Sequence, residues 1–128
     1  MSATELNDIA DTARDRDIRI ENLAAELTHA IYPLALRRGL KDSWIGMELG
    51  LWRALAEALQ YWDRQRPSAE SAAELEAWQE GLLVHLTESA FYIAARNGIE
   101  GPLLKVELDI YRAFRLVVRR WGRLREFV

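Results

Sequence analysis

Two pairs of histidine and glutamate are the residues of this chain whose types and spacing best suit chemistry. Glu26 precedes His29 by three positions, and His85 precedes Glu88 by three positions. Because residues three apart share one side of a helix, each pair predicts an imidazole next to a carboxylate. Such a pair can bind a divalent metal ion or move a proton during a reaction.

A metal centre is the first hypothesis that these pairs suggest. With Glu48 and Glu107 added, the set resembles the ligand inventory of the ferritin-like di-iron bundles, in which Glu-x-x-His motifs and single glutamates project into one interior. The resemblance concerns residue types, and the second pair has the reverse order. The candidate ligands within the two pairs are Glu26, His29, His85 and Glu88.

Helical geometry argues against an interior metal site. If Leu27 marks the core side of its helix, Glu26 lies about 100° away and His29 about 160° away. The same arithmetic about Leu86 turns the second pair outward as well. We therefore expect no metal, cofactor or catalytic residue, and a metal-binding bundle or an enzyme that uses these side chains is the alternative.

The elements that would carry these residues occur twice in the sequence. Residues 22–66 and 81–125 align without a gap at a constant offset of 59, with 13 identities in 45 positions. A chain of this composition gives roughly four such identities by chance. The repeat therefore predicts two copies of one supersecondary unit. Identical positions include Leu27/Leu86, Thr28/Thr87, Gly39/Gly98, Glu48/Glu107 and Trp62/Trp121.

Each copy has the periodicity of two helices joined by a short connection. Apolar residues within 20–34 fall on one face at 100° per residue. This helix ends at 37–39, because two arginines favour the C-terminal dipole and a glycine suits a left-handed cap. The third helix ends in the same way at 96–98. Pro33 predicts a kink that the second copy lacks.

Capping signals mark the starts of the other helices. Asp42 or Ser43 can cap the second helix, and Ser71-x-x-Glu74 forms a capping box for the third. Pro102 suits the first position of the fourth helix. Because the connections within each copy are short, each copy should form an antiparallel helical hairpin.

Two hairpins that each have one apolar face can cover each other by forming a four-helix bundle. We therefore predict an all-α fold, a four-helix up-down bundle made of two tandem-repeated hairpins with a pseudo-two-fold axis. Residues 18–128 form this single bundle. Residues 1–17 form a short or frayed N-terminal segment, with Leu6, Ile9 and Ala13 at helical spacing.

The composition excludes several classes of function. The chain of 128 residues has no cysteine, which excludes disulfides, thiolate catalysis and cysteine-ligated metal centres. A net charge of −3 gives no general reason to expect nucleic acid or a membrane as a partner. The polar start lacks the apolar stretch of a signal peptide, and no apolar run approaches the roughly 20 residues of a membrane span. We expect a cytoplasmic protein.

The fourth helix is rich in cations around Trp121, a combination that also suits a nucleic-acid surface. Glutamates within 70–80 should lie beside this end in an antiparallel hairpin. We interpret the charges as complementary within the fold and predict no nucleic-acid partner. The cations are Lys105, Arg112, Arg115, Arg119, Arg120, Arg123 and Arg125.

An arginine and a glutamate recur together in both copies. Glu48 and Glu107 lie about 60° from the centres of their apolar stripes. Arg37 and Arg96 end the preceding helices. We predict the ion pairs Arg37–Glu48 and Arg96–Glu107, each joining the helices of one hairpin across its loop, with a structural role.

A second apolar stripe lies opposite the core side of the helices and is present in both copies. A repeated set of this size that includes aromatics more often marks a partner surface. We therefore predict a non-enzymatic interaction or regulatory module, which forms a homodimer or binds another protein. The predicted interaction surface comprises Tyr32, Leu36, Leu49, Val84, Phe91, Ala95 and Leu108.

Two other interpretations of these apolar residues stay open. A splayed bundle with wide apolar sectors would bury the second stripe internally. A small-molecule sensor would hold its ligand in an apolar cavity between helices, which the five tryptophans could line.

Overall fold

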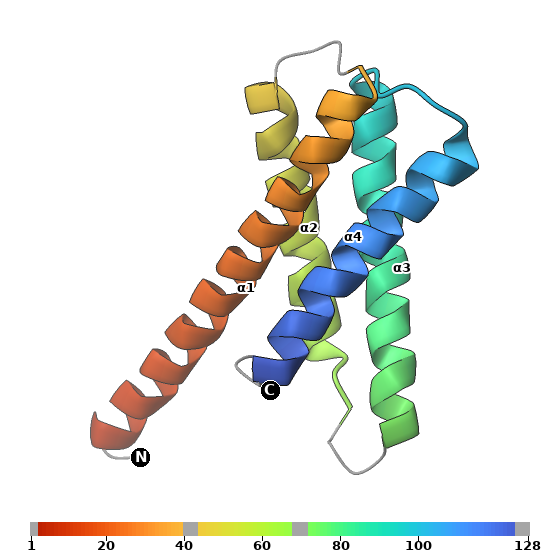
Figure 1. Cartoon of the computed structure of the whole chain (residues 1–128). Helices are drawn as coiled ribbons and strands as arrows, with labels where there is room; N and C mark the ends of the chain where they lie inside the picture. The colour runs from red at the N-terminus through yellow and green to blue at the C-terminus, as the bar shows by residue number, and fades with distance from the viewer. Residues whose placement is uncertain (1–2, 40–43, 68–71, 125–128) are drawn as a thin grey trace.

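The chain folds as four helices that pack side by side. The computed structural model describes residues 3–39, 44–67 and 72–124, with side chains for 14–39, 44–67 and 72–121. This part of the chain contains no strand, and its helices are α1 (Ala3–Arg37), α2 (Trp44–Arg64), α3 (Ala72–Arg96) and α4 (Leu103–Leu124). Successive helices run antiparallel, and α4 packs against both α3 and α1 (Figure 1). The predicted all-α four-helix fold is confirmed.

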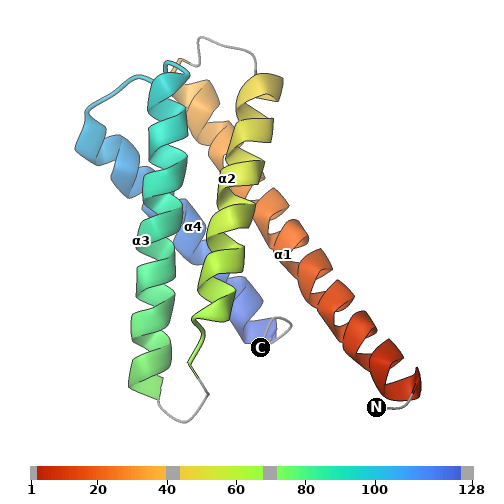
Figure 2. The same ribbon diagram turned by 180° about the vertical axis from the view of Figure 1, so that it is seen from behind.

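The N-terminal part of α1 extends beyond the other helices. Residues 3–17, predicted as a short or frayed segment, are helical and continuous with the rest of α1. Both ribbon views show this part projecting away from α2, α3 and α4 (Figure 1 and Figure 2). Pro33 lies inside α1 with its ring exposed, and the helix continues past it to Arg37. A ring that faces solvent removes one backbone hydrogen bond without opening the core.

Glycines with a left-handed backbone follow α1 and α3, as the sequence predicts. Gly39 has a φ of 68° and Gly98 has a φ of 86°. After α3, the amide of Gly98 donates to the carbonyl of Ala95 at 3.3 Å, and the amide of Ile99 donates to that of Ala94 at 3.2 Å. This pair of bonds is the Schellman motif, which satisfies the last carbonyls of a helix.

The start of α4 differs by one residue from the prediction. Pro102 precedes the helix, and its carbonyl accepts a hydrogen bond from the amide of Val106 at 3.0 Å. It therefore occupies the capping position rather than the first helical position. The caps predicted for α2 and α3 lie outside the described residues, at Asp42, Ser43 and Ser71.

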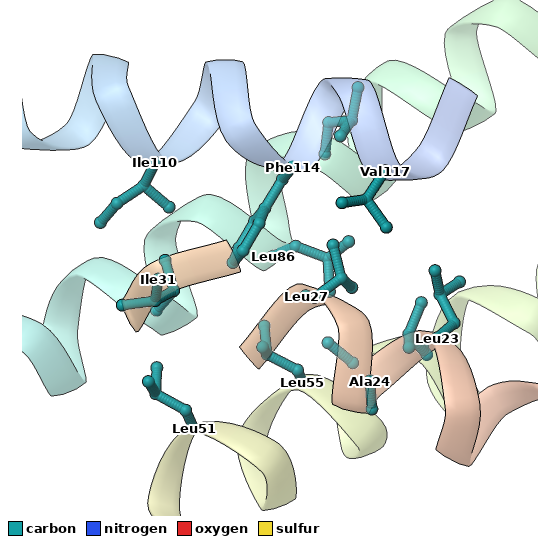
Figure 3. Packing of buried hydrophobic residues seen from close by; sticks show 14 of the residues in the cluster. Leu23, Ala24, Leu27, Ile31, Leu51, Leu55, Leu86, Ile110, Phe114 and Val117 are labelled. Atoms are coloured by element: carbon teal, nitrogen blue, oxygen red, sulfur yellow. The ribbon is translucent and has the colours of Figure 1, made fainter. Parts of the chain in front are cut away.

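The core is filled by one apolar stripe from each helix. The ring of Phe114 on α4 points toward Ile31 of α1 and Leu86 of α3, and all of these side chains are fully buried (Figure 3). Burial of a side chain of this size contributes about 1.5–3 kcal/mol to stability. The largest fully buried apolar side chains are Leu27, Ile31, Met47, Leu51, Leu55, Leu82, Leu86, Ile110 and Phe114.

Two threonines are the buried polar residues within the described part of the chain. The Thr28 hydroxyl donates to the carbonyl of Ala24 at 2.7 Å, and the Thr87 hydroxyl donates to that of Leu83 at 2.7 Å. A buried hydroxyl that makes such a bond avoids the desolvation penalty of an unpaired polar group. Neither threonine therefore needs a ligand to satisfy it.

A glycine lets α2 and α3 approach closely. A methyl group added at Gly81 on α3 would lie 2.6 Å from Cη2 of Trp62 on α2, well inside the usual carbon–carbon contact of about 3.5–4.0 Å. Trp62 is not free to move aside, because its indole nitrogen is hydrogen-bonded to α3. Gly46 on α2 offers a contrast, because no atom lies within 4 Å of a methyl group added there.

Replacing Gly81 with alanine should destabilise the fold by about 1–3 kcal/mol, because the added methyl group overpacks Trp62. Helix propensity alone predicts the opposite sign, a gain of up to about 1 kcal/mol. Gly46→Ala should show that gain and serves as the matched control. Urea unfolding followed by circular dichroism measures both changes. Equal stabilisation by the two substitutions would contradict the close packing at Gly81.

Candidate functional site

The two histidine–glutamate pairs lie on α1 and α3 and accept hydrogen bonds from tryptophans. Nε1 of Trp121 donates to Oε2 of Glu26 at 2.7 Å, and Arg120 donates to the same oxygen at 2.7 Å. Nε1 of Trp62 donates to Nδ1 of His85 at 2.7 Å. His85 is half-buried. The outward direction expected for His85 is therefore corrected, because the indole from α2 packs on it.

Glu26 is held in its charged form. Partial burial raises its pKa, but the hydrogen bonds from Trp121 and Arg120, together with the charge of Arg120, outweigh burial, so that the pKa lies below the usual value. A carboxylate held as an acceptor in this way has no proton to donate at neutral pH. Its position therefore suits a structural brace between α1 and α4.

The other members of the pairs, His29 and Glu88, are exposed. The described residues contain no group of three or more His, Asp or Glu side chains that could hold a metal ion. The lone pair of His85 on Nδ1 already accepts the bond from Trp62. The candidate ligands predicted from the sequence are thus divided between α1 and α3 and do not converge on one centre.

The tryptophans take part in separate contacts. Trp78 donates to the carbonyl of Trp62 at 2.8 Å. The ring of Trp44 lies 4.9 Å from that of Tyr32, and Trp52 lines a groove between α1 and α2. The hypothesis of a sensor with a tryptophan-lined cavity gains no support from these positions.

Arg38 makes the ion pair at the end of α1. Its Nη2 donates to Oδ2 of Asp109 at 2.6 Å, and its Nη1 donates to the carbonyl of Glu100 at 3.3 Å. The amide of Glu100 donates back to the carbonyl of Arg38 at 2.8 Å. Gly101 leaves room for this guanidinium, because a methyl group there would collide with Nη1. These bonds join the connection between α1 and α2 to the second hairpin.

The predicted pairs Arg37–Glu48 and Arg96–Glu107 are not among the ion pairs of the described residues. The next residue along a helix is turned by about 100°, which directs Arg38 at α4 and leaves Arg37 exposed. Arg96 lies over an aromatic ring of its own helix at 5.4 Å. Both glutamates instead line grooves on the outer sides of the hairpins.

Two open apolar grooves follow the outer sides of the hairpins. The first groove, between α1 and α2, has a volume of about 330 Å³, and the second groove, between α3 and α4, about 170 Å³. The first groove is lined by Ala25, Thr28, His29, Ile45, Glu48, Leu49 and Trp52. The second groove is lined by Val84, Thr87, Leu104, Glu107, Leu108 and Tyr111.

Six residues of the first lining, all except His29, lie 59 positions before the six residues of the second lining, and 59 is the offset of the sequence alignment. Exposure also agrees between them. Ile45 is 79% and Leu104 80% exposed, while Leu49 is 50% and Leu108 43% exposed. The matched positions are Ala25/Val84, Thr28/Thr87, Ile45/Leu104, Glu48/Glu107, Leu49/Leu108 and Trp52/Tyr111.

The predicted interaction surface coincides with the grooves in part. The members that line a groove are Leu49, Val84 and Leu108. The members that are exposed outside both linings are Tyr32, Leu36 and Ala95. Phe91 is half-buried and packs against the core, so this aromatic ring belongs to the bundle interior more than to its surface.

Ile45 and Leu104 are groove residues that the sequence interpretation missed. Each lies in the first turn of its helix, where a single turn is too short for periodicity to define a face. The repeat offset pairs them with each other. Two large apolar residues at matched positions were therefore the signal that could have identified them.

A charged cleft of about 450 Å³ lies elsewhere between α3 and α4, where Glu76 and Glu80 face Arg115 and Arg119. The hydroxyl of Tyr111 donates to both carboxylate oxygens of Glu80, at 2.8 and 2.9 Å. This bond raises the pKa of the Tyr111 hydroxyl, and burial and the charge of Glu80 add to the rise. Acidic and basic side chains thus share one cleft, as expected for complementary charges on these two helices.

Comparison of the chain with protein-family models, with curated proteins and with solved structures found no match. No helix of the described residues combines the length and the apolar character needed to cross a membrane.

Acid should weaken the fold through the Arg38–Asp109 pair. The hydrogen bond from Arg38 lowers the pKa of Asp109, desolvation opposes it, and neighbouring positive charges lower it further. The folded-state pKa therefore lies below the unfolded value of about 3.9. The pair contributes its full stability above that value and loses it as the pH falls through the folded-state pKa.

Asp109→Asn should accordingly lower the free energy of unfolding at neutral pH and flatten its decline as the pH falls below about 4. Urea unfolding at a series of pH values measures both effects. Glu57→Gln, at an exposed position of α2, is the control and should leave the curve unchanged. An acid limb that is the same in Asp109→Asn and in the wild type would contradict this role.

Proposed function

We propose that this chain is a non-enzymatic protein-interaction module with two docking grooves, one on each half of a duplicated helical hairpin. The observation that carries the proposal is the match between the two groove linings at positions 59 apart. Single exposed apolar residues are normal on any protein surface. Their recurrence at the same positions of two copies, beside an aromatic residue each time, favours a binding role.

The hydrogen bonds between the hairpins support the duplication. Trp62 and Trp121 hold the same position in the two copies, and so do His85 and Glu26. Each tryptophan donates its indole hydrogen at 2.7 Å to the acceptor in the other copy. A pseudo-two-fold axis between the hairpins would produce such an exchange. It also explains why the histidine and the glutamate are swapped, because either side chain can accept this bond.

Smaller features agree with the same interpretation. The buried hydroxyls of Thr28 and Thr87 make the same bond, each to the carbonyl four residues earlier. Gly39 and Gly98 have the same left-handed backbone after α1 and α3. These shared features at matched positions support the proposed duplication, and the groove linings agree with it.

A helix is the partner element that best suits such a groove. Two antiparallel helices leave a furrow between them into which an amphipathic helix can lay its apolar face. Ile45, Leu49 and Trp52 combine aliphatic and aromatic surface along α2, a mixture that is enriched in the buried centres of interfaces. The Thr28 hydroxyl at this groove donates a hydrogen bond within its own helix. A partner that covers it would therefore not leave a polar group without a hydrogen bond.

The homodimer expected from the sequence would fill only part of this surface. The α1–α2 and α3–α4 sides are opposite each other, because α1 neighbours α2 and α4 while α3 neighbours the same two helices. A closed two-fold dimer through one groove would therefore leave the other groove free. Under this proposal the free groove is available to a different protein.

Lysine at Leu49 and Leu108 should abolish docking while leaving the fold intact. Both side chains are about half exposed, so the substitution places a cation on each groove without entering the core. Helices selected from a displayed library for binding to the wild type should bind the double variant at least about tenfold more weakly. Circular dichroism and urea unfolding check the fold.

Leu116→Lys is the matched control, because Leu116 is 71% exposed and lies in neither groove lining. It should bind the selected helices as the wild type does. Equal binding by the double variant and the control would contradict docking in the grooves. Light scattering on the same variants tells whether a second copy of this chain is the partner.

A further inference from the structure

Each groove has a carboxylate in its wall. Glu48 is the charged residue that lines the first groove, together with the histidine His29, and Glu107 is the charged residue that lines the second. Both side chains are half-buried. The two carboxylates occupy matched positions of the two copies. Each groove therefore has a carboxylate at the same place in its wall.

Neither carboxylate forms an ion pair with a cation of the described residues. Asp63, Asp109 and Glu26 are among the acids that form ion pairs within residues 14–39, 44–67 and 72–121, and no ion pair of these residues uses Glu48 or Glu107. The sequence predicts Arg37 and Arg96 as partners, but Arg37 is exposed and Arg96 lies over an aromatic ring. Both carboxylates are partly exposed and therefore remain in contact with solvent in the free protein.

A partner that covers the grooves removes that water. Burying a carboxylate without a compensating charge carries a desolvation penalty, which opposes the gain from covering exposed leucines. A purely apolar partner would thus lose part of its binding free energy, and an acidic partner would add repulsion. A partner with a cation at this position would gain a partly desolvated ion pair.

We infer that each groove receives an amphipathic helix of another protein that carries a lysine or arginine beside its apolar stripe. This inference rests on the proposed function and names its partner class. The apolar stripe covers the exposed aliphatic residues, such as Ile45 and Leu49 in the first groove. The cation meets the carboxylate at the edge of that stripe.

The aromatic residues of the grooves fit the same partner. Trp52 follows Glu48 by four positions on α2, and Tyr111 follows Glu107 by four positions on α4, so each carboxylate has an aromatic ring on the same helix face. An aromatic ring next to a carboxylate favours a cation, because the ring face attracts positive charge. The apolar stem of a lysine or arginine packs against such a ring.

Two model peptides of about 18 residues, or five helical turns, test this inference. Both have the same leucine stripe, and lysine flanks the stripe in one peptide and glutamate in the other. Isothermal titration measures their affinity for the wild type and for the Glu48→Gln, Glu107→Gln and double variants. Glu57→Gln, which removes an exposed charge of α2 outside both linings, controls for the general attraction of a cationic peptide to an acidic protein.

The lysine peptide should bind the wild type and bind the double variant about tenfold more weakly, with no change for Glu57→Gln. The glutamate peptide should bind weakly to the wild type and more tightly to the double variant. Equal affinity of the two peptides, or the same loss in Glu57→Gln as in the double variant, would overturn the inference about charge.

The failures of the two proposals are distinguishable. If both peptides bind equally and Leu49→Lys with Leu108→Lys abolishes their binding, the grooves dock helices without charge selection, and only the present inference fails. If neither peptide binds, both proposals are overturned for helical partners. If light scattering shows a dimer that the two lysine substitutions dissociate, the occupant is a second copy rather than a cationic helix of another protein.

Discussion

Two indole hydrogen bonds join the hairpins of this protein. Trp62 at the end of α2 donates to His85 on α3, and Trp121 at the end of α4 donates to Glu26 on α1. Each bond places a large ring against the neighbouring hairpin and at the same time satisfies the single polar atom of that ring. The close approach at Gly81 and the ion pair from Arg120 to Glu26 both depend on where these rings lie.

The same constraint accounts for the histidine–glutamate pairs that first suggest chemistry. His85 and Glu26 are the members that turn toward tryptophans, whereas His29 and Glu88 face solvent. A titratable side chain used as an acceptor in a brace is a structural element. The carboxylates that are available to a partner are those of the grooves. There Glu48 and Glu107 lie among apolar residues and form no ion pair within the described residues.

In the proposed docking grooves, apolar residues favour binding of a partner, and a carboxylate selects among partners by their charge. Exposed aliphatic residues such as Ile45 and Leu104 supply apolar area that a partner can cover. The carboxylate beside them penalises partners that bring no cation. In the proposed duplication both properties were inherited by both copies, which would make the chain a connector between two partners of one class.

Local features of the fold followed from the sequence, and contacts between distant elements did not. The glycine caps and the buried stripes around Leu27 and Phe114 depend on short-range periodicity and backbone conformation, so they could be predicted. The choice of Arg38 over its neighbour as the partner of Asp109 depends on how α4 crosses the end of α1.

Some groove residues could be predicted from the sequence and others could not. Leu49 and Leu108 were predicted as surface residues from their helical angles. Ile45 and Leu104 were not, because an end turn has too few residues to show a face. The covering of His85 depends on α2 approaching α3 at Gly81, and no single-helix angle contains that information.

The number of helical peptides bound per chain tests the central claim most directly. Two matched grooves predict that calorimetric titration with the lysine-flanked leucine peptide ends at two peptides per chain, and at one after Leu49→Lys alone. A single site in the wild type, or a stoichiometry that Leu49→Lys leaves unchanged, would contradict the account of two equivalent docking grooves.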